Sequence, residues 1–287
     1  MLPSAEASST LLDWALLVVG LVVAALCIWF GPVLAGFVPV ESIWGATAFL
    51  YAFIFAPMVL IAIGFSVAAE APSFPLGVRS LWWAGIGLLT GIGGLAVAAG
   101  YAFLAGTMTS TTGSEIGAGL VVGAVIIAFQ VISEELFFRG WIQSLLKRRT
   151  GFMTAIAVTA LLFTGFHILG GARSPVTLLN LLIGGIWFGL LAWRSAGLVA
   201  PIAAHLGWNI SEQLLLGLDP NPGVGEFGSV GDWDLVGSEL WGGSDEGLNA
   251  SIAMTFVMLA LIIPLVRRPS AIAPAAPVPH QRGRAAA

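Results

Sequence analysis

The stretch SEELFFR, residues 133–139, places two carboxylates and a guanidinium inside a long run of apolar residues. The surrounding segment, about 117–147, is long and apolar enough to form a membrane-spanning helix. Each ionisable group at the centre of a bilayer costs roughly 2.5–3.5 kcal/mol on insertion scales. Three such groups in one helix therefore indicate a functional site, and their partners should lie elsewhere in the chain.

The composition is that of a polytopic membrane protein. Of the 287 residues, 58% are hydrophobic and 9% are charged, whereas soluble domains carry about 25% charged residues. We expect an all-α fold with about eight transmembrane helices, at approximately 12–36, 44–69, 81–106, 117–147, 152–170, 175–194, 198–217 and 249–266. This transmembrane domain (12–268) lies between an N-terminal segment (1–11) and a disordered tail (269–287). The basic residues form no dense patch, so we expect no nucleic-acid partner.

Basic residues predict the orientation in the bilayer. If the predicted helices alternate in direction, four basic sites fall on one side: Arg79, Lys147–Arg149, Arg194 and Arg267–Arg268. The opposite side has Arg173 and an acidic loop, 218–248. The positive-inside rule then places both termini in the cytoplasm, and the Ala/Gly/Val richness with compact loops favours a prokaryotic plasma membrane.

The two acids of the opening stretch point in different directions. Glu135 and Arg139 are four residues apart, so they share a helix face and can pair, and Gln143 continues that stripe. Glu134 points about 100° away, beside Gln130 one turn earlier. We expect Arg139 to hold Glu135 in a supporting role and Glu134 to face a cavity. The alternative is a charge cluster at the cytoplasmic end of the helix.

Two later segments supply further polar residues within apolar surroundings. His167 lies in the fifth predicted helix, and His205 and Asn209 share one face of the seventh. Taken singly, each could be a hydrogen-bonded core group or a contact between helices. Counted along the helices from the basic boundaries, however, Glu134 and these three residues all lie roughly 16–27 Å from the same membrane face. A common depth favours one joint site.

This set of groups is suited to hydrolysis of an amide. A carboxylate beside an imidazole can take a proton from water and make it a nucleophile. An imidazole and an amide side by side can donate hydrogen bonds to a developing oxyanion. Alternatively, Glu134, His167 and His205 could hold Zn²⁺ with one open position, although an H-E-x-x-H motif is absent.

The motifs EExxxR (134–139), FxxxH (163–167) and HxxxN (205–209) resemble, in this order, those of the CPBP intramembrane proteases. That family contains the CAAX prenyl endopeptidases and the Abi-type, bacteriocin-processing proteins. The resemblance covers residues 117–216, the expected catalytic core. It implies a helical membrane fold with a conical cavity open to the cytoplasm and to the bilayer.

The resemblance also implies roles for six residues: water activation by Glu134 and His167, oxyanion stabilisation by His205 and Asn209, and bracing by Glu135 and Arg139. The family has been described both as metalloproteases and as glutamate proteases. We favour the glutamate mechanism without a metal cofactor, because an asparagine one turn from His205 fits oxyanion stabilisation better than metal ligation. Zn²⁺ remains the alternative cofactor.

The expected partners are the lipid bilayer and a membrane-associated peptide, either a CAAX-type end, a leader or a sorting tail. A second hypothesis is a non-proteolytic scaffold or bacteriocin-immunity protein with the same fold. A third is a proton-coupled transporter, since Glu and His chains form proton relays, but two symmetric halves with broken helices are missing. Glu212 lies three residues after Asn209 and outside the family motif, and we expect a structural role for it. The sequence indicates no oligomeric state.

Overall fold

The computed structural model describes residues 5–69, 74–113, 116–220, 227–242 and 246–267. The predicted disordered tail, 269–287, lies outside these residues, as do the first four residues of the predicted N-terminal segment 1–11. The described chain is all-helical apart from three short strands, as expected from its composition. Helix α1 already begins at Ala5, inside the predicted N-terminal segment.

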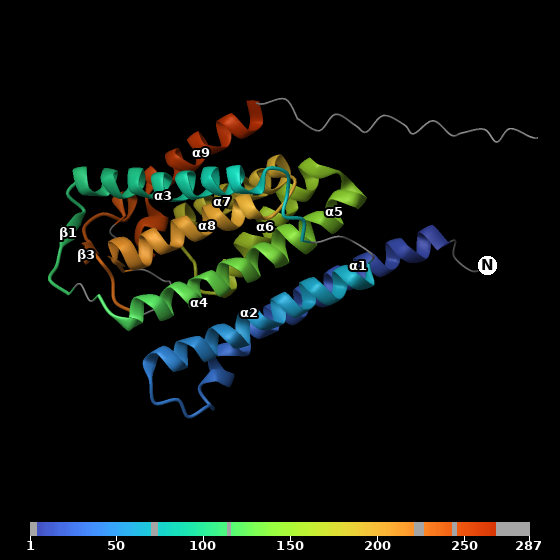
Figure 1. The fold of residues 1–287 in the computed structure, drawn as a ribbon, viewed down its shortest axis with the longest axis horizontal. Coiled ribbons are helices and arrows are strands. Elements are labelled where there is room, and N and C mark those ends of the chain that lie inside the picture. Colours follow the sequence, from blue (N-terminus) through green and yellow to red (C-terminus); the bar gives the residue numbers. More distant parts are fainter. Residues whose placement is uncertain (1–4, 70–73, 114–115, 221–226, 243–245, 268–287) are drawn as a thin grey trace, which may run out of the picture.

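The helical elements in chain order are α1 (Ala5–Ala35), α2 (Ile43–Ala68), α3 (Ser80–Leu104), α4 (Ala118–Glu135), the π-helix η1 (Leu136–Ile142), α5 (Gln143–Thr150), α6 (Phe152–Leu169), α7 (Pro175–Ser195), α8 (Val199–Ile210), the π-helix η2 (Ser211–Leu216), the 3₁₀ turns η3 (Glu239–Trp241) and η4 (Gly247–Ala250), and α9 (Ile252–Arg267). Figure 1 shows an elongated bundle, with α1 and α2 side by side along one flank and α9 on the opposite flank.

All eight predicted segments are helical, with ends close to the expected positions. Six helices within the described residues are long and apolar enough to cross a membrane: Thr10–Ala35, Ile43–Ala68, Ser80–Leu104, Ala118–Thr150, Phe152–Leu169 and Pro175–Ser195. The continuous α8–η2 segment carries several polar side chains, and α9 has only 16 residues. The predicted count of about eight spans is therefore not confirmed, whereas six candidate spans are found.

The basic loops lie together at one end of the bundle. Arg149 pairs with the buried Asp13 of α1, with 2.6 Å between Nη2 and Oδ2. Arg194, at the end of α7, donates from Nε to the carbonyl of Leu265 near the end of α9 (2.6 Å). Two further hydrogen bonds join the loops themselves, from the N–H of Val78 to the carbonyl of Ser195 (3.0 Å) and from Arg148 to the carbonyl of Ala69 (3.2 Å), so the loops share one end, which we call the basic end. The side of the membrane on which it lies remains a prediction.

A small sheet covers the opposite end, the sheet end. Strand β1 (Met108–Ser110) runs antiparallel to β3 (Trp233–Leu235), and β2 (Leu218–Asp219) runs parallel to β3. Described parts of the predicted loop 218–248 are thus hydrogen-bonded to the chain that follows α3. In Figure 1, β1 and β3 lie at the end of the bundle remote from α5 and from the start of α1.

Small residues allow the helices around the site to approach closely. The backbones of α3 and α8 meet at Gly91, where an added Cβ would overlap the carbonyl oxygen of Ala204. At Gly185 of α7 a Cβ would lie 3.0 Å from Cα of Ala160 in α6. Such small-residue contacts are typical of helix packing in membranes. They hold α6, α7 and α8 near the polar face of α4.

Candidate active site

The polar face of α4 continues without a break into the π-helix η1. Glu134 and Glu135 are the last two residues of α4, and Arg139 lies within η1. A π-helical turn inside an α-helix is rare and occurs frequently at functional sites. The extra residue in this turn changes which side chains η1 presents to α7.

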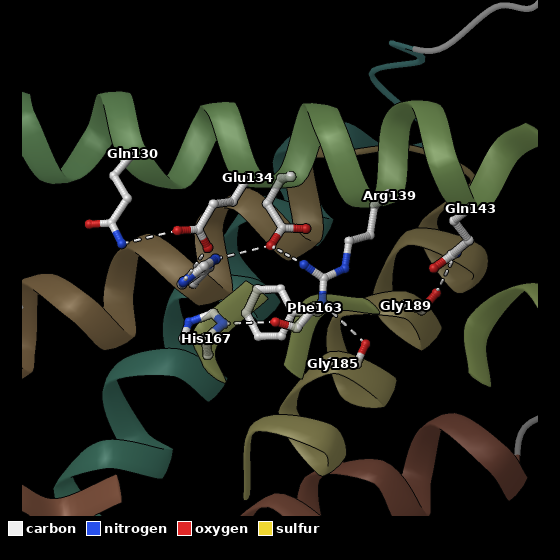
Figure 2. Close-up of polar contacts among 10 residues, drawn as sticks. Gln130, Glu134, Arg139, Gln143, Phe163, His167, Gly185 and Gly189 are labelled. Carbon is white, nitrogen blue, oxygen red and sulfur yellow. Dashed lines mark hydrogen bonds and ion pairs between the residues drawn. The ribbon is translucent and has the colours of Figure 1, made fainter. Parts of the chain in front are cut away.

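Glu135 and Arg139 form a fully buried ion pair. Arg139 Nη1 lies 2.9 Å from Glu135 Oε1, and neither side chain is exposed. The guanidinium also donates from Nη2 to the carbonyl of Gly185 (3.2 Å), and Gln143 Nε2 donates to the carbonyl of Gly189 (3.2 Å). Figure 2 shows Arg139 and Gln143 reaching from one helix to successive turns of α7. The predicted Glu135–Arg139 pair is confirmed.

Three aromatic rings surround the Arg139 guanidinium. Its Cζ lies 4.6 Å from the ring centre of Phe163, 5.2 Å from that of Phe188 and 5.8 Å from that of Phe138. A buried guanidinium is attracted to the negative face of such rings. The hydrogen bonds and the rings together offset part of the cost of burying this charge.

His205 joins the two neighbouring carboxylates. Its Nδ1 lies 3.0 Å from Glu135 Oε1, and its Nε2 lies 3.9 Å from Glu134 Oε2. The imidazole stacks on Phe188, with ring centres 4.7 Å apart and planes at 22°. Because a carboxylate oxygen only accepts, His205 Nδ1 carries the proton of the hydrogen bond to Glu135. The other ring nitrogen, Nε2, faces Glu134. Sequence reasoning paired His205 with Asn209 and missed this bond, because no spacing rule connects α4 and α8.

Glu134 has fewer partners than Glu135, although it is almost as deeply buried. Its side chain is 5% exposed. Oε1 accepts a hydrogen bond from Gln130 Nε2 (3.1 Å), one turn earlier on α4, as the sequence predicts. Oε2 accepts no hydrogen bond from any described residue. One oxygen of this carboxylate therefore keeps an unused capacity to accept a hydrogen bond, and it lies 3.9 Å from His205 Nε2.

His167 is held in a single tautomer. Its Nδ1 lies 2.9 Å from the carbonyl oxygen of Phe163, one turn earlier on α6. A carbonyl only accepts, so Nδ1 carries the proton and Nε2 keeps its lone pair. The ring also packs on the Phe163 ring, with centres 4.4 Å apart. In Figure 2 the imidazole lies on the Glu134 side of Phe163, away from Arg139.

One large cavity connects these side chains. It has a volume of about 690 Å³, and its lining includes Glu134, His167, His205 and Asn209. Four residues that the sequence singled out on three helices are thus brought around one space. Tyr51 of α2 also lines this cavity. Sequence reasoning missed it, since an aromatic residue in an apolar helix carries no functional signal by itself.

The cavity extends toward the sheet end. Its lining includes Gly170, Gly171 and Arg173 of the α6–α7 loop, which are exposed, and Glu246 before α9. None of the described residues of the segment Lys147–Arg149 lines it. The family resemblance implies a cytoplasmic opening, while the positive-inside rule places the basic end in the cytoplasm. These two expectations disagree, because the cavity opens at the other end.

The described residues contain no group of three or more His, Cys, Asp or Glu side chains arranged to hold a metal ion. Glu134, His167 and His205, the alternative zinc ligands, do not form such a group. Nδ1 of each histidine is already engaged, one with a backbone carbonyl and one with Glu135, which leaves Nε2 of each as the ring nitrogen that could bind a metal ion. In the described arrangement the three side chains do not converge as zinc ligands.

Residues 115–211 match the model of a protein family, described as type II CAAX prenyl endopeptidase, Rce1-like. The matched segment contains all three motifs and runs from the start of α4 to the end of α8. It is consistent with a CPBP family protease and confirms the resemblance seen in the motifs. Comparison with curated proteins and with solved structures finds no match.

Proposed function

We propose that this chain, whose motif-bearing helices match a CAAX-endopeptidase family, is an intramembrane endopeptidase that hydrolyses a peptide bond of a membrane-associated substrate. The family match supports the protease activity. The observation that carries the mechanism is the common cavity, on which a carboxylate, two imidazoles and an amide from α4, α6 and α8 converge. Such a set can activate water and stabilise an oxyanion without a serine or cysteine nucleophile.

Glu134 and His167 form the water-activating pair. Glu134 Oε2 accepts no hydrogen bond from the described residues, and His167 Nε2 has a lone pair because Nδ1 is tied to Phe163. A water bound by these two acceptors loses a proton to Glu134 as its oxygen attacks the carbonyl carbon. General base catalysis of this kind contributes typically 10²–10⁴-fold to a rate.

His205 and Asn209 stabilise the negative oxygen that this attack creates. With protons on both nitrogens, His205 donates to Glu135 through Nδ1 and to the oxyanion through Nε2. The Asn209 amide, one turn further along α8, supplies a second donor. When the tetrahedral intermediate collapses, the C–N bond breaks and the proton held by Glu134 passes to the leaving amine. The products are a new carboxyl end and a new amino end.

Glu135 and Arg139 position His205 and do not meet the substrate. Glu135 Oε1 binds both Arg139 Nη1 (2.9 Å) and His205 Nδ1 (3.0 Å). Arg139 is in turn fixed by Gly185 of α7. The imidazole is thus held by a chain of interactions across three helices, and its orientation needs no reorganisation during the reaction.

Substitution of Glu134 tests the function. We expect Glu134→Gln and Glu134→Ala to lower cleavage of a membrane-tethered peptide library by about 10²–10⁴-fold, with the protein still folded and inserted. Glu239→Gln, at an exposed glutamate of the sheet end, is the matched control. Full cleavage by Glu134→Ala would overturn the assignment. If the wild-type protein cleaves no peptide, the hypothesis of a non-proteolytic scaffold replaces that of an endopeptidase.

Removal of metal tests the mechanism separately. We expect purified protein to hold no stoichiometric metal and to keep its activity after treatment with a chelator. Loss of activity with chelator, followed by recovery with Zn²⁺, would show that the water is activated by a metal ion instead.

A further inference from the structure

Glu212 is a buried carboxylate for which the mechanism has no use. It lies three residues after Asn209, at the start of the π-helix η2. Its side chain is 6% exposed and lines the same cavity as Glu134. It makes no hydrogen bond or ion pair with any described residue, whereas the other buried acids among the described residues, Asp13, Glu134 and Glu135, each have a partner.

A buried carboxylate without a partner is costly. Transfer of an ionised carboxylate from water to an apolar interior is compensated in native proteins by an opposite charge or by several hydrogen bonds. Glu135 has both Arg139 and His205 as partners. A structural role for Glu212 in its ionised form would require a comparable partner, and the described residues supply none.

The charges on the cavity wall indicate what kind of group can supply the missing interaction. Apart from the histidines, the charged residues among its described lining are Glu134, Glu212, Glu246 and Arg173. Arg173 donates from Nη1 to the carbonyls of Ile168 and Ala172. Glu246 accepts hydrogen bonds from the backbone N–H groups of Arg173 and Ser174. Acids outnumber bases in this cavity, and Glu212 is the acid of its described lining that has neither a hydrogen bond nor an ion pair.

We propose that Glu212 binds a cationic group of the substrate, either a lysine or arginine side chain or the substrate's own amino terminus. The proposal rests on the proposed endopeptidase function and defines its substrate class as basic peptides. Asn209 and Glu212 lie on one stretch of helix, so a peptide bond held beside Asn209 places a neighbouring cation within reach of Glu212. Pairing with a cation offsets part of the cost of burying the carboxylate.

Matched peptides test this proposal. Each position of a membrane-tethered peptide library is set in turn to Lys or to Gln, and each peptide is prepared with a free or an acetylated amino terminus. We expect one position at which the wild-type protein prefers the cationic peptide by roughly tenfold to a hundredfold in kcat/KM. The Lys/Gln arm reports a side-chain cation, and the acetylation arm reports an amino terminus.

The variant Glu212→Gln should lower kcat/KM for the cationic peptide to the value for the uncharged peptide and so abolish this preference. Glu212→Lys should reverse it in favour of a peptide with Glu at the same position. The exposed glutamate control, Glu239→Gln, should keep the wild-type preference. An equal loss on charged and uncharged peptides, or no preference in the wild-type protein, would overturn the proposal. Cleavage without preference refutes only the cation site, whereas absence of any cleavage refutes the endopeptidase function itself.

Discussion

Glu134 and Glu135 are adjacent in the chain, but their carboxylates lie in different surroundings. One group of polar residues, the braced group, packs against α7 and consists of Glu135, Arg139 and Gln143. A second group, the cavity group, faces the cavity and consists of Glu134, His167, Asn209 and Glu212. His205 contacts both groups with its two ring nitrogens, Glu135 through Nδ1 and Glu134 through Nε2.

The difference between the groups lies in their partners more than in their burial. Glu134 and Glu135 are both at least nine-tenths buried. In the braced group the charges of Glu135 and Arg139 neutralise each other, although Glu135 Oε2, Arg139 Nε and Gln143 Oε1 are also buried without a hydrogen-bond partner among the described residues. The cavity group leaves carboxylate and imidazole atoms without protein partners, which costs stability and provides sites for water and substrate. A buried acid in this membrane protein is therefore best interpreted from its partners.

The largest expected effect is a difference in cysteine labelling between the two ends of the bundle. A cysteine on one side of the membrane either reacts with an impermeant reagent or does not. The chain has a single cysteine, Cys27, so Cys27→Ala gives a background free of thiols. In that background, we expect Ala172→Cys, beside the cavity mouth, to react with a membrane-impermeant maleimide in intact cells. Lys147→Cys, at the basic end, should react only after permeabilisation. We expect this pattern because basic residues are concentrated at the basic end, and the positive-inside rule places such an end in the cytoplasm.

The opposite labelling pattern would show that the cavity opens to the cytoplasm, as the family resemblance implies, and that this chain departs from the positive-inside rule. Labelling of both cysteines from the same side would contradict the placement of the two ends. The result also fixes the side from which a substrate reaches the cavity group.

A smaller but still large effect is expected within the braced group. Glu135→Gln leaves the Arg139 guanidinium buried without its counter-charge, and breaking a buried pair in this way costs about 3–5 kcal/mol. Glu134→Gln should change stability by less than about 1 kcal/mol, since Glu134 has only the Gln130 hydrogen bond to lose. Unfolding of the purified protein in detergent, followed by helical circular dichroism, measures both values.

The double variant Glu135→Leu, Arg139→Met provides the control for this comparison. Removal of both charges avoids an uncompensated one, so the double variant should be more stable than Glu135→Gln. It should still be inactive, because His205 loses the carboxylate that orients it. Equal destabilisation by Glu134→Gln and Glu135→Gln would show that the two acids do not differ in role.

Helix positions and the braced pair could be predicted from the sequence because both depend on local rules. Hydrophobic runs define the helices, and the four-residue spacing defines the Glu135–Arg139 pair. The same helical spacing predicts Gln130 beside Glu134, and the hydrogen bond between them confirms it. The common depth of Glu134, His167 and His205 followed from the constant rise of a helix.

Interactions between helices could not be predicted in this way. No spacing connects His205 to Glu135, or Phe188 to Arg139, because the contacts depend on how α7 and α8 pack against α4. The π-helical turns η1 and η2 also carry no clear signal in the sequence. The opening of the cavity toward the sheet end follows from the tertiary packing. Here the cytoplasmic opening that the family resemblance implies conflicts with the positive-inside rule, which places the basic end in the cytoplasm.

The smallest expected effect concerns Glu246, an acid at the mouth of the cavity that does have partners. It accepts hydrogen bonds from the N–H groups of Arg173 and Ser174 (2.7 and 2.8 Å), which precede α7, and so it caps that helix. Burial alone would raise the pKa of the Glu246 carboxyl, but the nearby Thr177 hydroxyl, the hydrogen bonds from Ser174 and Arg173, and the Arg173 charge lower it below its ordinary value.

Because the pKa of Glu246 is lower in the folded than in the unfolded protein, its ionised form stabilises the fold. This contribution is fully present above the unfolded pKa, about 4.3, and is lost as the pH falls through the lower folded pKa. Glu246→Gln should therefore destabilise the protein by no more than about 1 kcal/mol at neutral pH, since the carboxylate is partly exposed. The difference in free energy of unfolding between wild type and Glu246→Gln should shrink on acidification, whereas the control Glu239→Gln should show no such change.

A difference in free energy of unfolding that stays constant down to about pH 3 would mean that ionised Glu246 does not cap α7. The mouth of the cavity would then lack the charge-dependent bracing that distinguishes Glu246 from the unpartnered Glu212.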